Sequence, residues 1–142
     1  MDRAIYRIFD ANINRTKEGL RVCEEITRFI LNNRSLTTQL KNIRHRIDLV
    51  LKNMPSRLSF IAERESRHDI GRGIFGQELK RKGVSDILFA NMQRAKESTR
   101  VLEEFAKLIN RDTALEFKEI RYKIYETEKK IAAKIAALRH SR

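Results

Sequence analysis

A fifteen-residue polar pattern occurs twice in this chain and constrains its fold more than any other feature. Residues 11–25 and 90–104 match at nine of fifteen positions at an offset of 79, and seven of the nine matches are polar or charged. Packing between helices dictates where a repeat is apolar, but it does not dictate the identity of the polar side chains. Two copies therefore predict a pseudo-symmetric fold whose halves present the same polar groups, to each other or to a shared ligand.

Apolar residues that recur every three or four positions predict four helices. The first runs from about residue 2 to residue 32, and the second ends before Pro55. The third repeats the apolar stripe of the first, and the fourth begins near Asp112 or Thr113, either of which can cap it. The stripe of the first helix comprises Phe9, Ile13, Thr16, Leu20, Cys23, Thr27 and Ile30, and that of the third comprises Leu88, Met92, Ala95, Thr99, Leu102, Ala106 and Ile109.

The second and fourth helices also match, because the pattern Lys-x-Ile-Arg-x-x-Ile occurs at residues 41–47 and again at 118–124. We therefore predict an all-α fold, a four-helix bundle made of two pseudo-symmetric αα-hairpins joined by a long Gly/Arg-rich loop. At this length, residues 1–142 are expected to form a single helical domain. Its parts are repeat 1 at about 2–54, the connecting loop at about 55–83 and repeat 2 at about 84–139.

The charge of the chain narrows the classes of partner. The 31 Lys and Arg residues exceed the 19 Asp and Glu residues, which gives a formal charge of +12. This excess favours anionic partners, namely phosphorylated metabolites, nucleotides or nucleic acid. The alternative is that the chain is an ordinary Lys/Glu-rich helical protein, in which such a charged composition is common. Nucleic-acid binding is not expected, because the positive charge is spread along every element and few aromatic residues are placed to stack on bases.

The expected cellular location rests on the lack of a membrane-spanning segment and of a signal region in the sequence. No run of eighteen apolar residues predicts a membrane span, and the N-terminal residues contain no apolar signal region. Cys23 is the single cysteine, so an internal disulfide is excluded, and its place on the apolar stripe indicates core packing. A cytoplasmic location is expected.

The repeated polar residues form a ridge along each long helix. Residues three positions apart are neighbours on a helix surface, and an Arg side chain can hold a carboxylate or phosphate with two parallel hydrogen bonds. A Glu side chain can orient an Arg, accept a proton or hold a metal ion. The alternative is that the Glu and Arg residues pair across the bundle and only fix its register. The two ridges are Asn12, Arg15, Glu18 and Arg21, and Asn91, Arg94, Glu97 and Arg100.

A second group of candidate residues lies in the loop at 64–73. Arginines beside glycines, here Arg64 and Arg67, can present donors to a phosphate, and Asp69 is a candidate magnesium ligand or general base. The alternative is that this segment is a solvated charged linker. The repeated glutamate pairs at 24–25 and 103–104 are non-specific metal candidates, because adjacent helical residues point about 100° apart and cannot form one chelate.

These segments together resemble a known family across nearly the whole chain. Residues 10–24 read Asp-Ala-Asn-Ile-Asn-Arg-Thr-Lys-Glu-Gly-Leu-Arg-Val-Cys-Glu, and residues 90–104 repeat much of this pattern. Arg64-Glu65 and Asp69-Ile70-Gly71 match the central motif, with Glu65 where the family has Asp and Arg72 where it has Thr. The chain resembles the second type of hydroxymethylpyrimidine phosphate kinase, a helical domain found alone or N-terminal to thiamine-phosphate synthase.

The resemblance implies an activity. The expected reaction is transfer of the ATP γ-phosphoryl group to 4-amino-2-methyl-5-hydroxymethylpyrimidine phosphate, with Mg²⁺ as cofactor, in thiamine biosynthesis. Catalytic roles would fall to Asp69, Glu18 and Glu97, and metal binding to Asp69 and Glu104. Binding of substrate or phosphate would fall to Asn12, Arg15, Arg21, Arg64, Arg67, Asn91, Arg94 and Arg100.

An alternative function also follows from this resemblance. It is a non-catalytic interaction or dimerisation domain associated with thiamine-phosphate synthase. Four apolar residues on the long helices either finish the core or form a homodimer interface, and a homodimer is expected: Val22, Phe29, Val101 and Leu108.

Overall fold

The computed structural model describes residues 2–54, 57–73 and 80–140, and every regular element in these ranges is a helix. The all-α part of the prediction is therefore confirmed. The four long helices are α1 (Arg3–Glu25), α2 (Arg34–Lys52), α4 (Val84–Ala106) and α5 (Arg111–His140). Two short elements extend or precede them, a π-helix directly after α1 (Ile26–Ile30) and the helix α3 (Arg57–Ala62).

Asparagine and aspartate side chains fix where three of the long helices begin. Asp2 Oδ1 accepts a hydrogen bond from Ala4 N at 2.8 Å at the start of α1. Asn33 caps α2 by accepting from the Leu36 amide at 2.9 Å. Asn110 does the same for α5, because its Oδ1 accepts from Thr113 N at 2.8 Å. The predicted cap at Asp112 or Thr113 is therefore wrong, since the preceding asparagine satisfies the free amide of the first turn.

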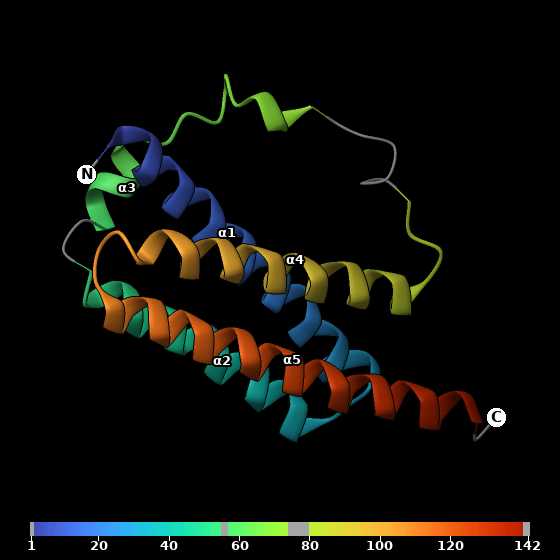
Figure 1. Ribbon diagram of the computed structural model, residues 1–142. Coiled ribbons are helices and arrows are strands. Elements are labelled where there is room, and N and C mark those ends of the chain that lie inside the picture. Colours follow the sequence, from blue (N-terminus) through green and yellow to red (C-terminus); the bar gives the residue numbers. More distant parts are fainter. Residues whose placement is uncertain (1, 55–56, 74–79, 141–142) are drawn as a thin grey trace.

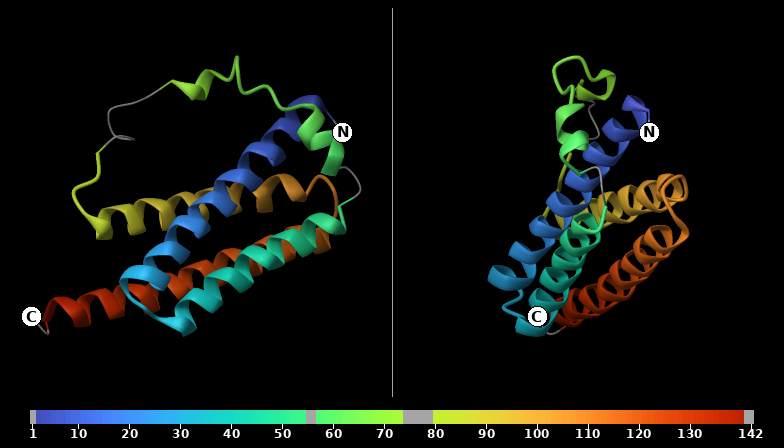
Figure 2. Two further views of the ribbon diagram at one scale, coloured as in Figure 1. Left: turned by 180° about the vertical axis from the view of Figure 1, so that it is seen from behind. Right: turned by 90° about the vertical axis from the view of Figure 1, so that its left-hand side faces the viewer.

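Each long helix packs against two others. α1 contacts α2 and α4, and α5 contacts α4 and α2, so the two consecutive pairs lie side by side (Figures 1 and 2). Between α1 and α4, Thr16 Oγ1 and Ser98 Oγ share a buried hydrogen bond of 2.6 Å. The exact relation of the two hairpins by a two-fold axis stays a prediction.

The core combines the two predicted apolar stripes with apolar residues of α2, α3 and α5. Six of the seven residues of the first stripe are buried, and so are six of the seven of the second. The exceptions are Ile109, which is partly buried, and Ile30, whose side chain is 57% exposed. Ile30 lies in the π-helical turn, where each turn holds more residues than an α-turn, so the stripe loses register there.

The predicted irregular loop at 55–83 contains helical structure and packs on α1. α3 brings the buried Phe60 ring against Phe9, with 5.2 Å between ring centroids and 15° between ring planes, and against Tyr6 at 5.3 Å. A 3-10 turn follows at Ile70–Arg72. The connecting loop predicted at about 55–83 therefore includes a short helix, and residues 55–56 and 74–79 lie outside the described ranges.

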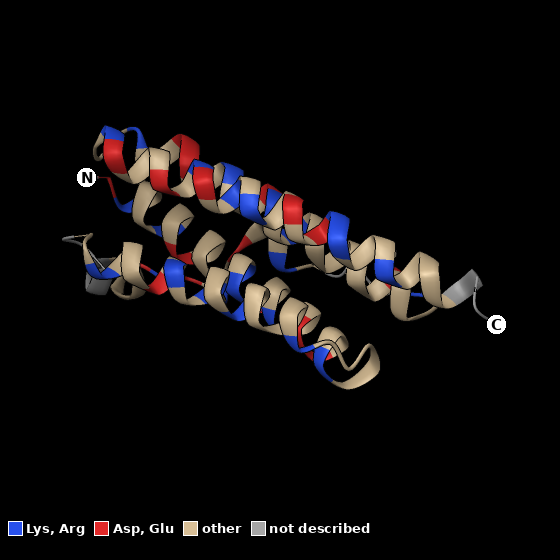
Figure 3. Cartoon of the chain, turned by 90° about the horizontal axis from the view of Figure 1, so that it is seen from below, with Lys and Arg blue, Asp and Glu red and all other residues tan. Residues whose placement is uncertain are grey.

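Charged side chains are distributed along the helices instead of gathering on one of them. Figure 3 shows Lys and Arg interleaved with Asp and Glu along the long helices. In the described ranges, no helix combines the length and the apolar composition that crossing a bilayer requires.

Candidate functional site

Two buried glutamates occupy equivalent places in the repeats, and each is neutralised by an arginine of the following helix. Glu24 on α1 accepts two hydrogen bonds from Arg44 on α2, at 2.6 Å from Nε and 3.1 Å from Nη2. Glu103 on α4 accepts from Arg121 Nε on α5 at 2.8 Å. Hydrogen bonding to the carboxylates raises the pKa of Arg44 and of Arg121. These glutamates therefore hold each hairpin together.

A second pair of salt bridges is also repeated. Lys17 Nζ lies 2.6 Å from Asp48 Oδ1, and Lys96 Nζ lies 2.8 Å from Glu128 Oε1. Each joins the first helix of a hairpin to the second. Two of the seven polar matches, Lys17 with Lys96 and Glu24 with Glu103, thus have partners on α2 and α5, helices that the fifteen-residue motif does not include.

The repeated asparagines use their amide nitrogens inside their own helices. Asn12 donates to Ile8 O at 2.9 Å, and Asn91 donates to Ile87 O at 2.8 Å. Asn12 Oδ1 also accepts a long hydrogen bond of 3.4 Å from Arg15. Each of these bonds uses one of the two donors of the side-chain amide nitrogen.

Six residues of the two ridges are exposed, and four of them lack an ionic partner among the described residues. Arg15 and Arg94 are equivalent, as are Glu18 and Glu97. None of the four forms an ion pair with any residue that the structure describes. Glu97 accepts a hydrogen bond from the neighbouring Gln93 at 2.8 Å. Folding therefore does not account for these charges.

The structure brings Asn12, Arg15, Arg64 and Asp69 together around a cavity of about 470 Å³ beside α1. Arg64 is held there by the buried Asp10, with hydrogen bonds of 2.7 Å from Nε and 2.6 Å from Nη2. This ion pair raises the pKa of the Arg64 guanidinium. The sequence analysis missed Asp10 as the partner, although it is the first residue of the quoted motif.

The remaining predicted residues do not join this cavity. Arg67 is exposed and outside its lining, and Arg21 borders a different cavity farther along α1. The second ridge, on α4, borders none of five cavities that lie among residues 2–54, 57–73 and 80–140, so none of these five is lined by both ridges.

The two predicted metal ligands have other partners. Asp69 Oδ1 accepts from Gly71 N at 2.8 Å and caps the 3-10 turn. Glu104 Oε1 lies 2.9 Å from Lys107 Nζ and 2.8 Å from Arg100 Nη2, and hydrogen bonding to Lys107 lowers the pKa of Glu104. Within the described ranges, no three His, Cys, Asp or Glu side chains group as metal ligands would. These residues therefore do not fit the predicted magnesium ion.

Comparison with known proteins finds long relatives that contain a similar segment. The chain is 37% identical over 137 residues to a thiamine-phosphate synthase of Rhodopirellula baltica, covering 96% of the chain and 36% of that relative. It is 37% identical over 129 residues to one of Nostoc punctiforme, covering 90% and 35%, and 40% identical over 134 residues to one of Synechocystis, covering 88% and 35%. The chain thus spans about a third of the length of these curated relatives. No solved structure matches it.

These relatives correct the predicted activity. They carry the name of a different enzyme of thiamine biosynthesis, thiamine-phosphate synthase, so the predicted phosphorylation of hydroxymethylpyrimidine phosphate is contradicted. The same names support the alternative that the sequence analysis kept open, a helical domain associated with that synthase.

The family itself is identified independently of these names. A family profile matches residues 7–130, which include the four long helices except for the ends of α1 and α5. Both copies of the repeated motif and the cavity beside α1 lie within this match. The chain belongs to the ThiD2 family.

Proposed function

We propose that the chain is a non-catalytic helical interaction module that binds thiamine-phosphate synthase. One observation carries the proposal: the match to the Rhodopirellula baltica relative covers 96% of the chain but 36% of that protein. A unit of this size recurs as one part of a longer synthase. Its natural partner is therefore the remainder of such a synthase, in the same polypeptide or as a separate chain.

Exposed apolar residues supply a candidate docking surface. Phe29 and Leu108 occupy equivalent positions of the two repeats, and their side chains are 65% and 66% exposed. Val22 and Val101, one heptad earlier on each helix, are half-buried. Apolar anchors surrounded by charged residues are typical of protein interfaces. The exposed repeated charges Arg15, Arg94, Glu18 and Glu97 would form the polar part of the same interface.

The test is direct binding to a thiamine-phosphate synthase from the same organism, measured by isothermal titration calorimetry. We expect saturable binding with a Kd at or below about 1 µM, which corresponds to about −8 kcal/mol. The double variant Phe29→Ser/Leu108→Ser should weaken this binding at least about tenfold, because both anchors are lost.

Leu49→Ser is the matched control for this variant. Leu49 lies on α2 with 58% of its side chain exposed and has no apolar equivalent in the second repeat. It should leave the affinity within about twofold. Absence of binding at about 100 µM of both proteins would reject the proposal.

The predicted homodimer is tested on the chain alone by light scattering after size-exclusion chromatography. If Phe29 and Leu108 mediate self-association, the wild type should run as a dimer and the double variant as a monomer. A monomeric wild type that still binds the synthase would assign this surface to the synthase instead.

A further inference from the structure

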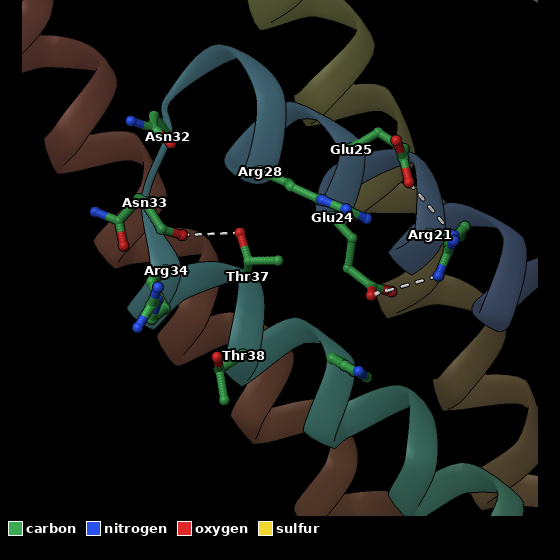
Figure 4. Close-up of a pocket in the computed structure, with 10 residues that line it drawn as sticks. Arg21, Glu24, Glu25, Arg28, Asn32, Asn33, Arg34, Thr37 and Thr38 are labelled. Atoms are coloured by element: carbon green, nitrogen blue, oxygen red, sulfur yellow. Dashed lines mark hydrogen bonds and ion pairs between the residues drawn. The ribbon is translucent and has the colours of Figure 1, made fainter.

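The π-helix Ile26–Ile30 borders two cavities of different character. One, of about 690 Å³, lies between the end of α1 and the start of α2 and is lined by charged, amide and hydroxyl side chains (Figure 4). The other, of about 500 Å³, is a groove lined mainly by apolar side chains. Segments distant in the sequence meet at this apolar groove, namely the π-helix, the start of α4 and the last turns of α5. Its apolar residues are Ile26, Ile30, Leu31, Val84, Ile135 and Leu138.

Folding leaves much of this groove uncovered. The side chains of Ile30, Val84 and Leu138 are 57%, 40% and 49% exposed. Exposed apolar residues scattered singly are ordinary, but several that surround one groove mark an interaction site. Positive charge is also in excess beside the groove, because residues 80–82 read Lys-Arg-Lys and the lining carries one carboxylate, that of Asp86. An apolar partner segment with an acidic residue therefore fits this surface.

The start of α1 shows how this fold covers a surface of this kind. Phe60 of α3 is buried there, with its ring stacked on Phe9 and tilted against Tyr6. Glu63 follows directly after α3, and its Oε2 lies 2.6 Å from Nε of Arg3. One short helix thus closes the start of α1 with an aromatic ring and with a carboxylate three positions later.

The start of α4 carries counterparts of these residues but no covering helix. At the offset of 79 between the repeats, Lys82 takes the position of Arg3, and Ser85 takes that of Tyr6. α3 follows α2, whereas α5 continues as one unbroken helix and no short helix follows it in the described ranges (Figure 1). Lys82 forms no ion pair with any residue that the structure describes. The groove therefore presents an apolar surface and a cation without the aromatic ring and the carboxylate that cover the start of α1.

We infer that this groove binds a short helix of a partner protein, in the way that α3 covers the start of α1. The partner helix would place an aromatic ring among Ile30, Val84 and Leu138. A carboxylate three positions later would face Lys82, because residues three apart are neighbours on a helix surface. Aromatic residues that fill an apolar pocket are typical anchors where a helix binds in a groove. The inference does not rest on the proposed function, since it concerns a different surface from the one proposed to bind the synthase.

The probe is a peptide with the sequence of residues 57–66, held helical by a staple between positions 58 and 62. These positions lie opposite Phe60 on a helix, so the staple leaves the aromatic ring and Glu63 accessible. Titration into the purified chain, followed by NMR of its methyl groups, should show saturable binding with a Kd at or below about 1 mM. The largest shifts should fall on Ile30 and Leu138. A peptide with Phe60→Ala should bind at least about tenfold more weakly.

The double variant Ile30→Ser/Leu138→Ser should also weaken binding at least about tenfold. Its matched control is Leu49→Ser/Leu115→Ser, because these leucines are 58% and 46% exposed and lie outside the groove. The control should change the affinity by less than about twofold. All four side chains are about half exposed, so the far-UV circular dichroism of both double variants should stay that of the wild type.

A change of charge at Lys82 tests the acidic part of the motif separately. Lys82→Glu should weaken binding of the peptide with Glu63 about threefold, and it should strengthen binding of a peptide with Glu63→Lys by a similar factor. The same affinity for both peptides in the wild type and in this variant would contradict the predicted contact.

Three results of the titration would overturn the inference. They are lack of saturation at about 5 mM peptide, equal weakening by both double variants, and shifts centred on Ile5, which would indicate exchange with α3. Light scattering tests whether a second copy of the chain occupies the groove instead. A wild type that is dimeric, with Ile30→Ser/Leu138→Ser monomeric, would show this and overturn the inference of a partner helix. None of these results bears on binding to the synthase, which is measured separately.

Discussion

Gly19 marks the closest approach of α1 to α4, and replacing it by alanine should destabilise the protein. A Cβ atom at this position would lie 2.8 Å from the backbone oxygen of Asn91 and 3.7 Å from the Ala95 Cβ. Ordinary contacts of a Cβ begin near 3.4 Å, so the helices would have to separate by roughly 0.6 Å. The obstructing atom belongs to the backbone, so it cannot move away by a change of rotamer as a flexible side chain could.

Two effects of opposite sign decide the size of the change. Alanine is favoured over glycine inside a helix by about 1 kcal/mol. Overpacking of a well-packed interface costs about 1–3 kcal/mol. Separation of the helices would also lengthen the buried bond between Thr16 and Ser98, worth about 1 kcal/mol. We therefore expect a net loss of about 1–3 kcal/mol, which lowers the Tm by roughly 3–12 °C for a chain of this size.

The assay is urea unfolding followed by circular dichroism, with wild type and variant compared at equal m-values. Gly73→Ala is the control, because a Cβ there meets no atom within 4 Å and the backbone already has a negative φ of −55°. It should change the free energy of unfolding by less than about 0.5 kcal/mol. If Gly19→Ala proved as stable as the wild type or more stable, helix propensity would outweigh the contact and the reasoning would be refuted.

Three further predictions follow from the contacts of the fold. A double-mutant cycle with Glu24→Gln and Arg44→Gln, measured by urea unfolding, should give a coupling of about 1–3 kcal/mol; a coupling near zero would contradict the role of this pair in holding the hairpin. Burial raises the pKa of the Cys23 thiol from 9.0 to about 12, so the native protein should resist a disulfide reagent at pH 8. The unfolded chain loses this proton at lower pH than the native protein does, so the free energy of unfolding should fall as the pH rises from about 9 to about 12. Rapid labelling of the folded protein would contradict this burial. Asp10→Asn removes the ionic partner of Arg64, so trypsin should cleave after Arg64 faster than in the wild type, and an unchanged rate would show that this pair does not anchor the segment after α3.

The helices were predictable because their apolar residues recur at helical spacing and because the motif occurs twice. α3 was not, since six residues are too few to show a period and its order depends on Phe60 stacking against Phe9, far away in sequence. The exposure of Ile30 was also beyond sequence reasoning. The apolar spacing of the first repeat alone does not reveal a π-helical turn. The turn becomes detectable only when the spacing of the first repeat is compared with that of the second.

The polar site was predictable in its composition but not in its contacts. Sequence spacing placed Asn12 and Arg15 on one face of α1, but it does not show which residues of other helices meet them. Asp10 pairs with Arg64, 54 positions away, and Glu24 pairs with Arg44 on the next helix. Such long-range partners depend on how the helices cross, so the sequence left open whether each charge was structural or free.

Comparison of the two copies with the fold separates the duplicated polar residues into two classes. Asn12 and Glu24, like their counterparts on α4, hydrogen-bond within their own helix or hairpin, so folding alone accounts for their identity. Arg15 and Glu18 recur in the second copy, where their counterparts are exposed and equally without ionic partners in the described chain. A charge that the fold does not use gains nothing from duplication unless something outside the chain contacts it. We therefore propose that the partner surface lies on the exposed ridges of α1 and α4. A bound synthase should then protect the backbone amides of these ridges from hydrogen exchange and leave those of α5 unchanged.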